Sequence, residues 1–327
     1  MRDAFEKFVE HDIKLYAISY DDQETLVEFA REQRIPFPLL SDLASQVIEQ
    51  YGILNTQVSK DDAFLYGIPF PGVYVADEQG DVVAKFFHDT YKKRDSPETF
   101  INAALGRVIV DESAPSTSLA DDEVAITASV VGGKGTIRQG VIRELVVQFE
   151  MADGLHIYGE PVPQGMVATT VQITGPAGIA MLDAQYPPTE PFQIAAMDLD
   201  LEVFSGTATI VVPFYAKGEL ASETRPLDQD AIELSVEVRY QACTENECLL
   251  PRTEILTLNL AMDVIDMPGL SLHRGHGQRE SSYDSMPAMR RLIWRKLKQH
   301  PLGLPKFLWK NFKLEMAARK RVRAASQ

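Results

Sequence analysis

The chain's 327 residues, 45% of them hydrophobic and with 20 Gly and 19 Pro, are too many for one ordinary core and too apolar for general disorder, so two domains plus further segments are expected. The net charge of −15 conceals an acidic body and a basic tail: residues 1–266 carry 18 Lys and Arg against 44 Asp and Glu, and residues 267–327 carry 14 against 3. Phosphates repel such a body, so nucleic-acid binding could rest only on the tail.

Residues 1–110 predict a lobe in which short strands alternate with helices. Asp21 and Asp22 follow an apolar run and are typical of a helix cap, and Pro97 after Ser96 marks the first turn of a last helix. The expected elements are a strand at 13–19, a helix at 22–33, an extended piece at 37–40, a helix at 42–51 capped by Asp42, hairpin strands at 73–76 and 82–86, and a helix from Ser96. The lobe is therefore expected to be α/β.

The next 150 residues predict a linker and an all-β domain. Residues 111–123 are acidic, contain Ser and Pro and lack periodicity, which is typical of a linker. Residues 124–265 contain short alternating runs separated by Gly and Pro turns, at 124–130, 143–149, 167–173, 208–214, 232–240 and 254–260. This spacing predicts a β-sandwich of about the size of an immunoglobulin domain.

The tail, residues 266–327, is basic and is expected to be partly helical. Its two basic segments, Ala288–Gln299 and Lys306–Arg323, are separated by Pro301, Gly303 and Pro305. Residues 288–323 mix apolar and basic side chains, which suits an interfacial helix pair on anionic lipid. Docking to the acidic body or to an acidic partner protein, and binding to nucleic acid, are alternatives that the composition leaves open.

The sequence leaves the location of the protein undecided. No apolar run reaches the roughly 18 residues that a membrane span needs, and charges interrupt the first twenty residues, so no secretory signal is visible. The chain as written is expected to be cytoplasmic, or periplasmic or exported if its start is truncated. No cofactor and no metal are expected.

Three motifs in the first lobe resemble one family. Their order and spacing resemble the carboxy-terminal part of the alkyl hydroperoxide reductase/thiol-specific antioxidant family, the peroxiredoxin-like branch of the thioredoxin fold. The matching residues are Lys14–Asp21, Phe37–Asp42 with Tyr51-Gly52-Ile53, and Gly67–Asp77. Members carry an attacking cysteine at a helix start before the first motif, whereas this chain has no cysteine before Cys243. The resemblance therefore implies a redoxin lobe without intrinsic peroxidase activity.

The resemblance also implies a gap in the lobe. In the family fold, the strand that leads to the missing cysteine lies between the strands that match 14–19 and 73–77. A sheet without that strand would leave unpaired backbone groups on both sides. We expect either a start truncated relative to the family or a remnant whose sheet has closed differently.

Residues 124–265 resemble a second family, the amino-terminal domain of the thiol:disulfide interchange protein DsbD. The segment Tyr240–Pro251 resembles its YQxC…C…P hairpin, and Asp153–Tyr158 resembles its DG-hydrophobic-Y motif, with His156 where an aromatic residue is frequent. The resemblance implies an immunoglobulin-like fold whose cysteine pair, Cys243 and Cys248, exchanges electrons with a thiol or disulfide protein. Because no membrane domain is present in this sequence, the electron donor would be another protein.

The two cysteines have several interpretations. A ring of about six residues contributes only about 2 kcal/mol of loop entropy, which favours a redox-active pair over a structural disulfide. Inert thiols and half of a zinc site are the remaining alternatives. Glu245 and Glu247 flank the pair and are expected to disfavour a thiolate.

Four further residues are candidate neighbours of the thiols. His156 and Tyr158 alternate with apolar residues, so both can face the cysteine hairpin; Asp183 and Tyr186 fall where the second family carries a loop that covers the cysteines. Ordinary packing, and for the last two a plain loop, is the alternative. The sequence thus predicts a thiol–disulfide oxidoreductase, or alternatively a non-enzymatic adaptor whose tail docks to a membrane or partner.

Overall fold

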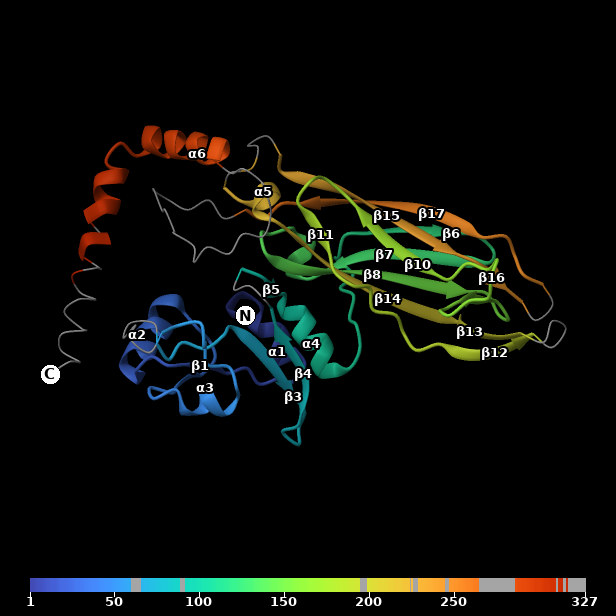
Figure 1. Ribbon diagram of the computed structural model, residues 1–327, viewed down its shortest axis with the longest axis horizontal. Helices are drawn as coiled ribbons and strands as arrows, with labels where there is room; N and C mark the ends of the chain where they lie inside the picture. Colours follow the sequence, from blue (N-terminus) through green and yellow to red (C-terminus); the bar gives the residue numbers. More distant parts are fainter. Residues whose placement is uncertain are drawn as a thin grey trace. The chain divides into compact units, whose positions relative to one another are not determined.

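The computed structural model describes residues 1–59, 66–88, 92–194, 199–223, 225, 229–244, 247–264, 286–309, 311–313 and 316 (Figure 1). The chain divides into two compact units, whose main bodies are residues 1–108 and 109–264. The expected mixed architecture, an α/β lobe followed by a β domain, is present in these two units. Each unit is described by itself.

The first unit contains the expected strands and helices in the expected order. Its elements are η1 (Arg2–Ala4), α1 (Phe5–Glu10), β1 (Ala17–Ser19), α2 (Gln23–Gln33), β2 (Leu39–Ser41), α3 (Gln46–Gln50), β3 (Gly72–Ala76), β4 (Val82–Phe87), β5 (Arg94–Asp95) and α4 (Pro97–Leu105). Asp22 caps α2 as expected, because its carboxylate accepts a hydrogen bond of 2.8 Å from the Thr25 amide. The sequence-based bounds of β1 and α3 were too wide.

The late start of α3 has a local cause. The Asp42 carboxylate accepts hydrogen bonds from the amides of Gln46 and Ile48, at 3.0 and 2.8 Å. It therefore caps the helix from several residues upstream, across a turn that includes Ser45 with a φ of 53°. The Ser96 hydroxyl, in contrast, accepts no hydrogen bond from a backbone amide of α4 and instead forms a hydrogen bond of 3.2 Å with the Thr99 hydroxyl.

The strands of this lobe form two separate small sheets. β1 pairs with β2 in parallel, and β3 pairs with β4 as an antiparallel hairpin. Within the described residues no strand joins β1 to β3, which is the arrangement expected if the intervening family strand is missing. The buried apolar side chains of the lobe are correspondingly few: Phe8, Leu26, Ile48, Val75, Phe100 and Ile101.

The second unit is built almost entirely from strands. Its elements are β6 (Ser116–Ala120), β7 (Val124–Val131), η2 (Gly133–Gly135), β8 (Val141–Met151), β9 (His156–Tyr158), β10 (Thr170–Thr174), β11 (Ile179–Met181), β12 (Glu190–Ile194), β13 (Leu199–Ser205), β14 (Thr207–Ala216), α5 (Gly218–Ala221), β15 (Ala231–Tyr240), β16 (Ala242–Cys243) and β17 (Arg252–Ala261). All six strands expected from the alternating pattern are present.

The expected linker is not free of structure. Residues 116–120 form β6, which pairs along its length with β7 from Ser116↔Ser129 to Ala120↔Ala125. β6 lies at the edge of its sheet and its side chains are mostly exposed, so its sequence lacks the apolar alternation of an inner strand. A polar edge strand is thus easily mistaken for a linker.

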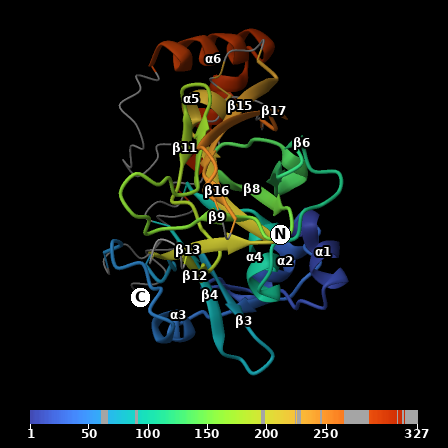
Figure 2. The same cartoon turned by 90° about the vertical axis from the view of Figure 1, so that its right-hand side faces the viewer.

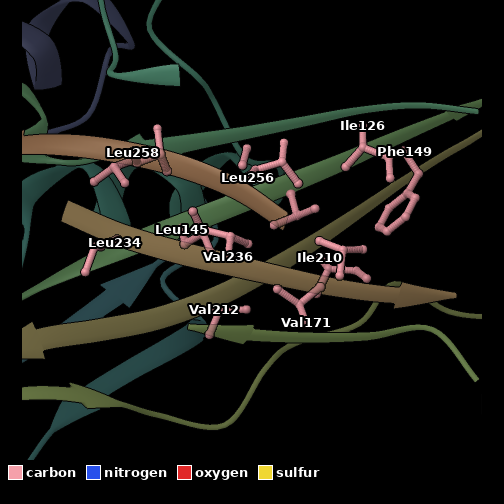
Figure 3. Close-up of a cluster of buried hydrophobic side chains, with 14 of the residues drawn as sticks. Ile126, Leu145, Phe149, Val171, Ile210, Val212, Leu234, Val236, Leu256 and Leu258 are labelled. Atoms are coloured by element: carbon pink, nitrogen blue, oxygen red, sulfur yellow. The ribbon is translucent and has the colours of Figure 1, made fainter. Parts of the chain in front are cut away.

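Two sheets pack face to face around the main core. One sheet contains β11-β14-β8-β7-β6 and the other contains β10-β15-β17. Figure 3 shows their inward side chains in contact, including Leu145 and Phe149 of β8, Val236 of β15 and Leu256 of β17. Buried and exposed residues alternate along β15 and β17, so the period-2 pattern located them, whereas most of β8 is buried on both faces.

A third sheet, with the order β12-β13-β9-β16, lies at one end of this unit and faces the viewer in Figure 2. Its strands prolong those of the sandwich: β9 follows β8, β16 follows β15, and β13 leads into β14. The bend between β13 and β14 occurs at Gly206, whose φ of 62° favours glycine. The chain thus passes directly from core strands into the sheet that carries both the Asp153–Tyr158 motif and Cys243.

The tail contains α6 (Met286–Gln299), and residues 303–309 and 311–313 are also helical. The expected first basic segment, Ala288–Gln299, therefore lies within α6. Residues 265–285 and 317–327, which include the end of the expected segment Lys306–Arg323, lie outside the described residues.

One ion cluster predicts how the β unit responds to acid. Asp121 accepts hydrogen bonds of 2.8 Å from the amides of Glu123 and Val124 and pairs with Arg252, and these amides together with Arg252 lower the pKa of Asp121. A group with a depressed folded-state pKa contributes stability that is fully present above its unfolded-state pKa, about 3.9 for Asp. This contribution is lost as the pH falls through the folded-state pKa. Asp121→Asn should therefore lower the urea midpoint at pH 7 and flatten its decline between about pH 5 and pH 2.

Asp122→Asn, the same change at the adjacent residue, is the control and should leave the acid profile unchanged. An unaltered acid profile in the Asp121 variant would contradict this role of Asp121.

Candidate functional site

The cysteine segment forms a short hairpin. Cys243 and Cys248 are bridge partners in antiparallel orientation, and both are free thiols. The Leu249 amide donates to the Ala242 carbonyl at 2.9 Å, and the Thr244 amide donates to the Glu247 carbonyl at 2.9 Å. Directly opposed antiparallel residues have Cα separations of about 4.5–5.5 Å, within the range of about 4.4–6.8 Å that a disulfide needs. The pair can therefore close a disulfide without large backbone movement.

The sheet beneath the hairpin has two faces with different neighbours. Cys243 lies opposite His156, and Ala242 lies opposite Ile157. Since side chains alternate along a strand, Cys243, His156 and Tyr158 share one face, whereas Ala242 and Ile157 point into the main core. The thiol face carries its own buried cluster, which consists of Tyr158, Leu201, Val203 and Cys243 with Val162, Met166, Phe192 and Cys248 packed against it.

The two thiols differ in exposure. Cys243 is fully buried, whereas Cys248 is partly exposed. Burial raises the pKa of the Cys243 thiol, the Tyr158 hydrogen bond opposes that rise, and the neighbouring Cys248 adds to it. A thiolate at Cys243 is disfavoured, as was expected for the pair, but the dominant cause is burial and not the flanking acidic residues. Glu245 lies outside the described residues.

Tyr158 forms a hydrogen bond with one thiol of the pair. Its hydroxyl donates to Cys248 Sγ at 3.1 Å while its ring is fully buried. Burial, followed by the hydrogen bonds with Cys248 and Cys243, raises the pKa of Tyr158 well above its ordinary value. The phenol therefore stays protonated at neutral pH and remains a hydrogen-bond donor to sulfur.

Tyr158→Phe should slow the alkylation of the thiols. The substitution removes the hydroxyl that donates to Sγ of Cys248, the accessible sulfur, and a hydrogen bond to a charged group contributes roughly 1.5–3 kcal/mol. We expect the iodoacetamide rate at pH 7 to fall about tenfold. Tyr186→Phe is the matched control, because that hydroxyl interacts with the Val171 backbone instead; equal rates in the two variants would exclude this role for Tyr158.

Gln241 fixes the hairpin to the rest of the unit. Its side-chain amide donates to the Leu249 carbonyl at 2.9 Å, and its side-chain oxygen accepts from the Val167 amide at 2.9 Å. The side chain is buried, so both bonds are shielded from water. Gln241 stands within the YQxC segment, but the sequence alone assigns no role to it.

His156 is held beside Cys243 by neighbouring strands. Its Nδ1 lies 2.8 Å from the Ser205 hydroxyl, and its ring centroid lies 4.4 Å from that of Phe192. Ser205 pairs with His156 across β13 and β9. Ser205 and Phe192 gave no signal in the sequence, because only the register of the sheet brings them to this face.

The structure does not bring Asp183 and Tyr186 to the thiols in the same way. Neither takes part in the hydrogen bonds around Cys243 and Cys248. Tyr186 interacts with the Val171 backbone, and burial raises its pKa. Within the part of the chain that the structure describes, no group of three or more His, Cys, Asp and Glu side chains could hold a metal ion.

Two opposed thiols, one buried and one accessible, beside a protonated tyrosine are a site suited to thiol redox chemistry. Comparison with protein families agrees: residues 134–260 match the family described as thiol:disulfide interchange protein DsbD, N-terminal. Residues 1–85 match the AhpC/TSA family. Both resemblances inferred from the sequence are thereby confirmed.

Curated relatives match the first lobe. A chloroplastic peroxiredoxin Q of Populus jackii is 31% identical over 105 residues, which are 32% of this chain and 43% of the relative. The chloroplastic peroxiredoxin Q of Sedum lineare is 30% identical over 105 residues, which are 50% of that protein. The chain thus spans half or less of the length of these relatives.

Solved structures match the β unit with low scores. The N-terminal periplasmic domain of ScsB from Proteus mirabilis is 15% identical with a TM-score of 0.32, over 46% of this chain and 52% of that chain. The reduced N-terminal domain of DsbD from Neisseria meningitidis is 17% identical with a TM-score of 0.24, over 45% and 85%.

Proposed function

We propose that this protein exchanges disulfides with a protein partner through Cys243 and Cys248, with Cys248 as the attacking thiol. The observation that carries the proposal is the opposition of a buried and a partly exposed thiol on one hairpin, with the Tyr158 hydroxyl 3.1 Å from Cys248 Sγ. A partner sulfur can approach Cys248, whereas Cys243 is shielded from solvent. Cys243 is therefore assigned the resolving role.

The exchange proceeds in two substitutions at sulfur. The Cys248 thiolate attacks one sulfur of the partner's disulfide, a mixed disulfide forms, and the partner's other sulfur leaves as a thiolate. Cys243 then gives up its proton to that thiolate and attacks Cys248 Sγ, which forms the Cys243–Cys248 bond and releases the partner's second sulfur. The partner gains two electrons and the pair loses two; the reverse sequence oxidises a partner dithiol.

The order of attack follows from the chemistry of the site. Burial disfavours a thiolate at Cys243, so a partner's disulfide is expected to react first at the accessible Cys248. Support also comes from the matched family, which is described as an interchange protein. Asp183 and Tyr186, although not bonded to the thiols, are proposed to lie beside the path of approach.

A redox titration tests this function. The chain has only two cysteines, so every thiol that an alkylating reagent counts belongs to the pair. In buffers of stepped glutathione ratio, we expect a reversible two-electron transition at a potential above about −300 mV. A pair that stays dithiol throughout, or that reduces only well below this potential, would favour the non-enzymatic adaptor.

Peroxide turnover should be absent from this polypeptide. Peroxide reduction in the AhpC/TSA manner needs an activated thiolate at a helix start, and residues 1–242 contain no cysteine. With excess dithiothreitol, peroxide consumption should equal that of the buffer. Turnover that persists in the Cys243→Ser, Cys248→Ser double variant would refute this expectation and would require another catalytic group.

A further inference from the structure

The tail has a charge pattern unlike the rest of the chain. Between Asp284 and Glu315 no acidic residue occurs, and the same stretch holds eight basic residues: Arg290, Arg291, Arg295, Lys296, Lys298, Lys306, Lys310 and Lys313. The only two tryptophans of the protein, Trp294 and Trp309, also lie there. Basic and aromatic residues are thus concentrated in one short segment.

The two helical segments of the tail repeat one arrangement. In α6 the Trp294 ring is 66% exposed, with Lys298 Nζ 5.8 Å from its centroid. In the following segment the Trp309 ring is 60% exposed, with Lys313 Nζ 5.4 Å from its centroid. Each segment therefore presents an indole with an ammonium one helical turn further along, and Figure 1 draws the segments as separate helices.

The second segment adds an exposed apolar stripe. Leu304, Leu308, Phe312 and Met316 are spaced four residues apart, so they lie on one face of a helix. All four are exposed, and Phe312 stacks on Trp309 at 6.0 Å between ring centroids. Lys306 and Lys313 are seven residues apart, the spacing of a neighbouring row on a helix. We call Leu304, Leu308, Trp309, Phe312 and Met316, together with Lys306 and Lys313, the tail stripe.

We propose that the tail stripe and Trp294 bind the surface of an anionic lipid bilayer, which goes beyond the exchange function. A row of aliphatic and aromatic side chains beside a row of lysines fits a boundary at which acyl chains meet phosphate. Indole rings favour headgroup depth, and adjacent lysines can extend to the phosphates. Nucleic acid would use the lysines and indoles but would leave Leu308 and Met316 in water.

Charge balance makes this binding sensitive to salt. Each basic residue near an anionic bilayer contributes about fivefold in affinity, whereas the acidic body, with 18 Lys and Arg against 44 Asp and Glu, is repelled. Both effects are screened beyond about 10 Å at 0.1 M salt, so only the residues in contact retain their attraction. No described helix is long and apolar enough to cross a membrane.

Intrinsic fluorescence of the full chain tests the proposal directly, because Trp294 and Trp309 are the only tryptophans and both lie in the tail. Vesicles of phosphatidylcholine with one third phosphatidylglycerol should shift the emission to the blue and sediment the protein at low salt. Pure phosphatidylcholine vesicles should bind at least tenfold more weakly. The absence of a blue shift and of sedimentation with anionic vesicles at low salt would overturn the proposal.

Two pairs of variants separate the apolar and the charged contributions. Leu308→Ser with Phe312→Ser removes apolar surface without changing the charge and should abolish the blue shift, whereas Leu43→Ser with Phe29→Ser, at two exposed apolar residues of the first lobe, should not. Lys306→Glu with Lys313→Glu should weaken binding at least tenfold, whereas Lys14→Glu with Arg107→Glu, the same charge change elsewhere, should have little effect.

If the variant changed at Leu308 and Phe312 still sediments with anionic vesicles, the tail adsorbs by charge alone. That result would contradict the proposed insertion of the tail stripe's apolar side chains. Stronger binding to a duplex oligonucleotide than to anionic vesicles at the same salt would assign the tail to nucleic acid instead. The thiol titration should be unchanged in every tail variant, so failure of the membrane proposal and failure of the exchange proposal give different results.

Discussion

Replacing Cys248 with serine should abolish disulfide exchange, lowering the rate with oxidised glutathione about a thousandfold or more, because a serine hydroxyl cannot replace a thiolate nucleophile. Cys243→Ser should have a different effect. It leaves Cys248 able to attack but removes the resolving thiol, so a stable glutathione adduct should accumulate at Cys248. Intact-protein mass spectrometry after alkylation distinguishes the two results.

The wild-type chain is the control for trapping, since it should pass through the adduct and end as the intramolecular disulfide. Because the chain has two cysteines, each single variant retains one thiol whose adduct can be assigned without mapping. If the Cys248→Ser variant formed an adduct on Cys243 as fast as the Cys243→Ser variant forms one on Cys248, the assigned attacking and resolving roles would be wrong. An adduct in neither variant would reject the exchange function.

Phe149→Ala should strongly destabilise the β unit. Phe149 is fully buried, and its ring meets Tyr240 edge to face with centroids 5.7 Å apart. Truncation of a buried Phe costs about 3–5 kcal/mol, because the transfer free energy is lost and a cavity remains. Such a loss is a large part of the roughly 5–15 kcal/mol that stabilises a typical domain.

Urea unfolding of the β unit, followed by circular dichroism, measures this loss. Ile255→Ala provides the comparison on β17, where the side chain is 60% exposed, and should change the stability by less than about 1 kcal/mol. A Phe149 variant as stable as the Ile255 variant would show that the core collapses around the missing ring.

The sequence predicted those strands whose two faces differ. β15 and β17 alternate because one side faces the core, and their period-2 pattern can be read without a structure. β9, although only three residues long, was anticipated from the alternation of His156 and Tyr158 with apolar neighbours, whereas β6 could not be found in this way because it is an exposed edge strand. Their pairing is decided by neighbours distant in the chain.

The candidate site follows the same division. Local motifs pointed to Cys243, Cys248 and Tyr158, because the residues that define them are adjacent in sequence. Ser205 was not predicted, since it reaches His156 only through the register of β13 on β9. The raised pKa of Cys243 was expected from nearby acidic residues, but burial is its main cause, and burial depends on the complete fold.

Only Gln241 separates β15 from β16, so the thiol hairpin has no hinge of its own on that side, whereas a turn at residues 152–155 separates β8 from β9. The backbone that carries Cys243 is an extension of strands at the centre of the sandwich, and Gln241 ties the hairpin at two further points. Local opening would have to break bonds that are shared with the core. The rate of labelling of Cys243 in the resting protein should therefore equal the rate at which the whole sandwich opens. The reactivity of this sulfur thus reports on cooperative unfolding of the β unit.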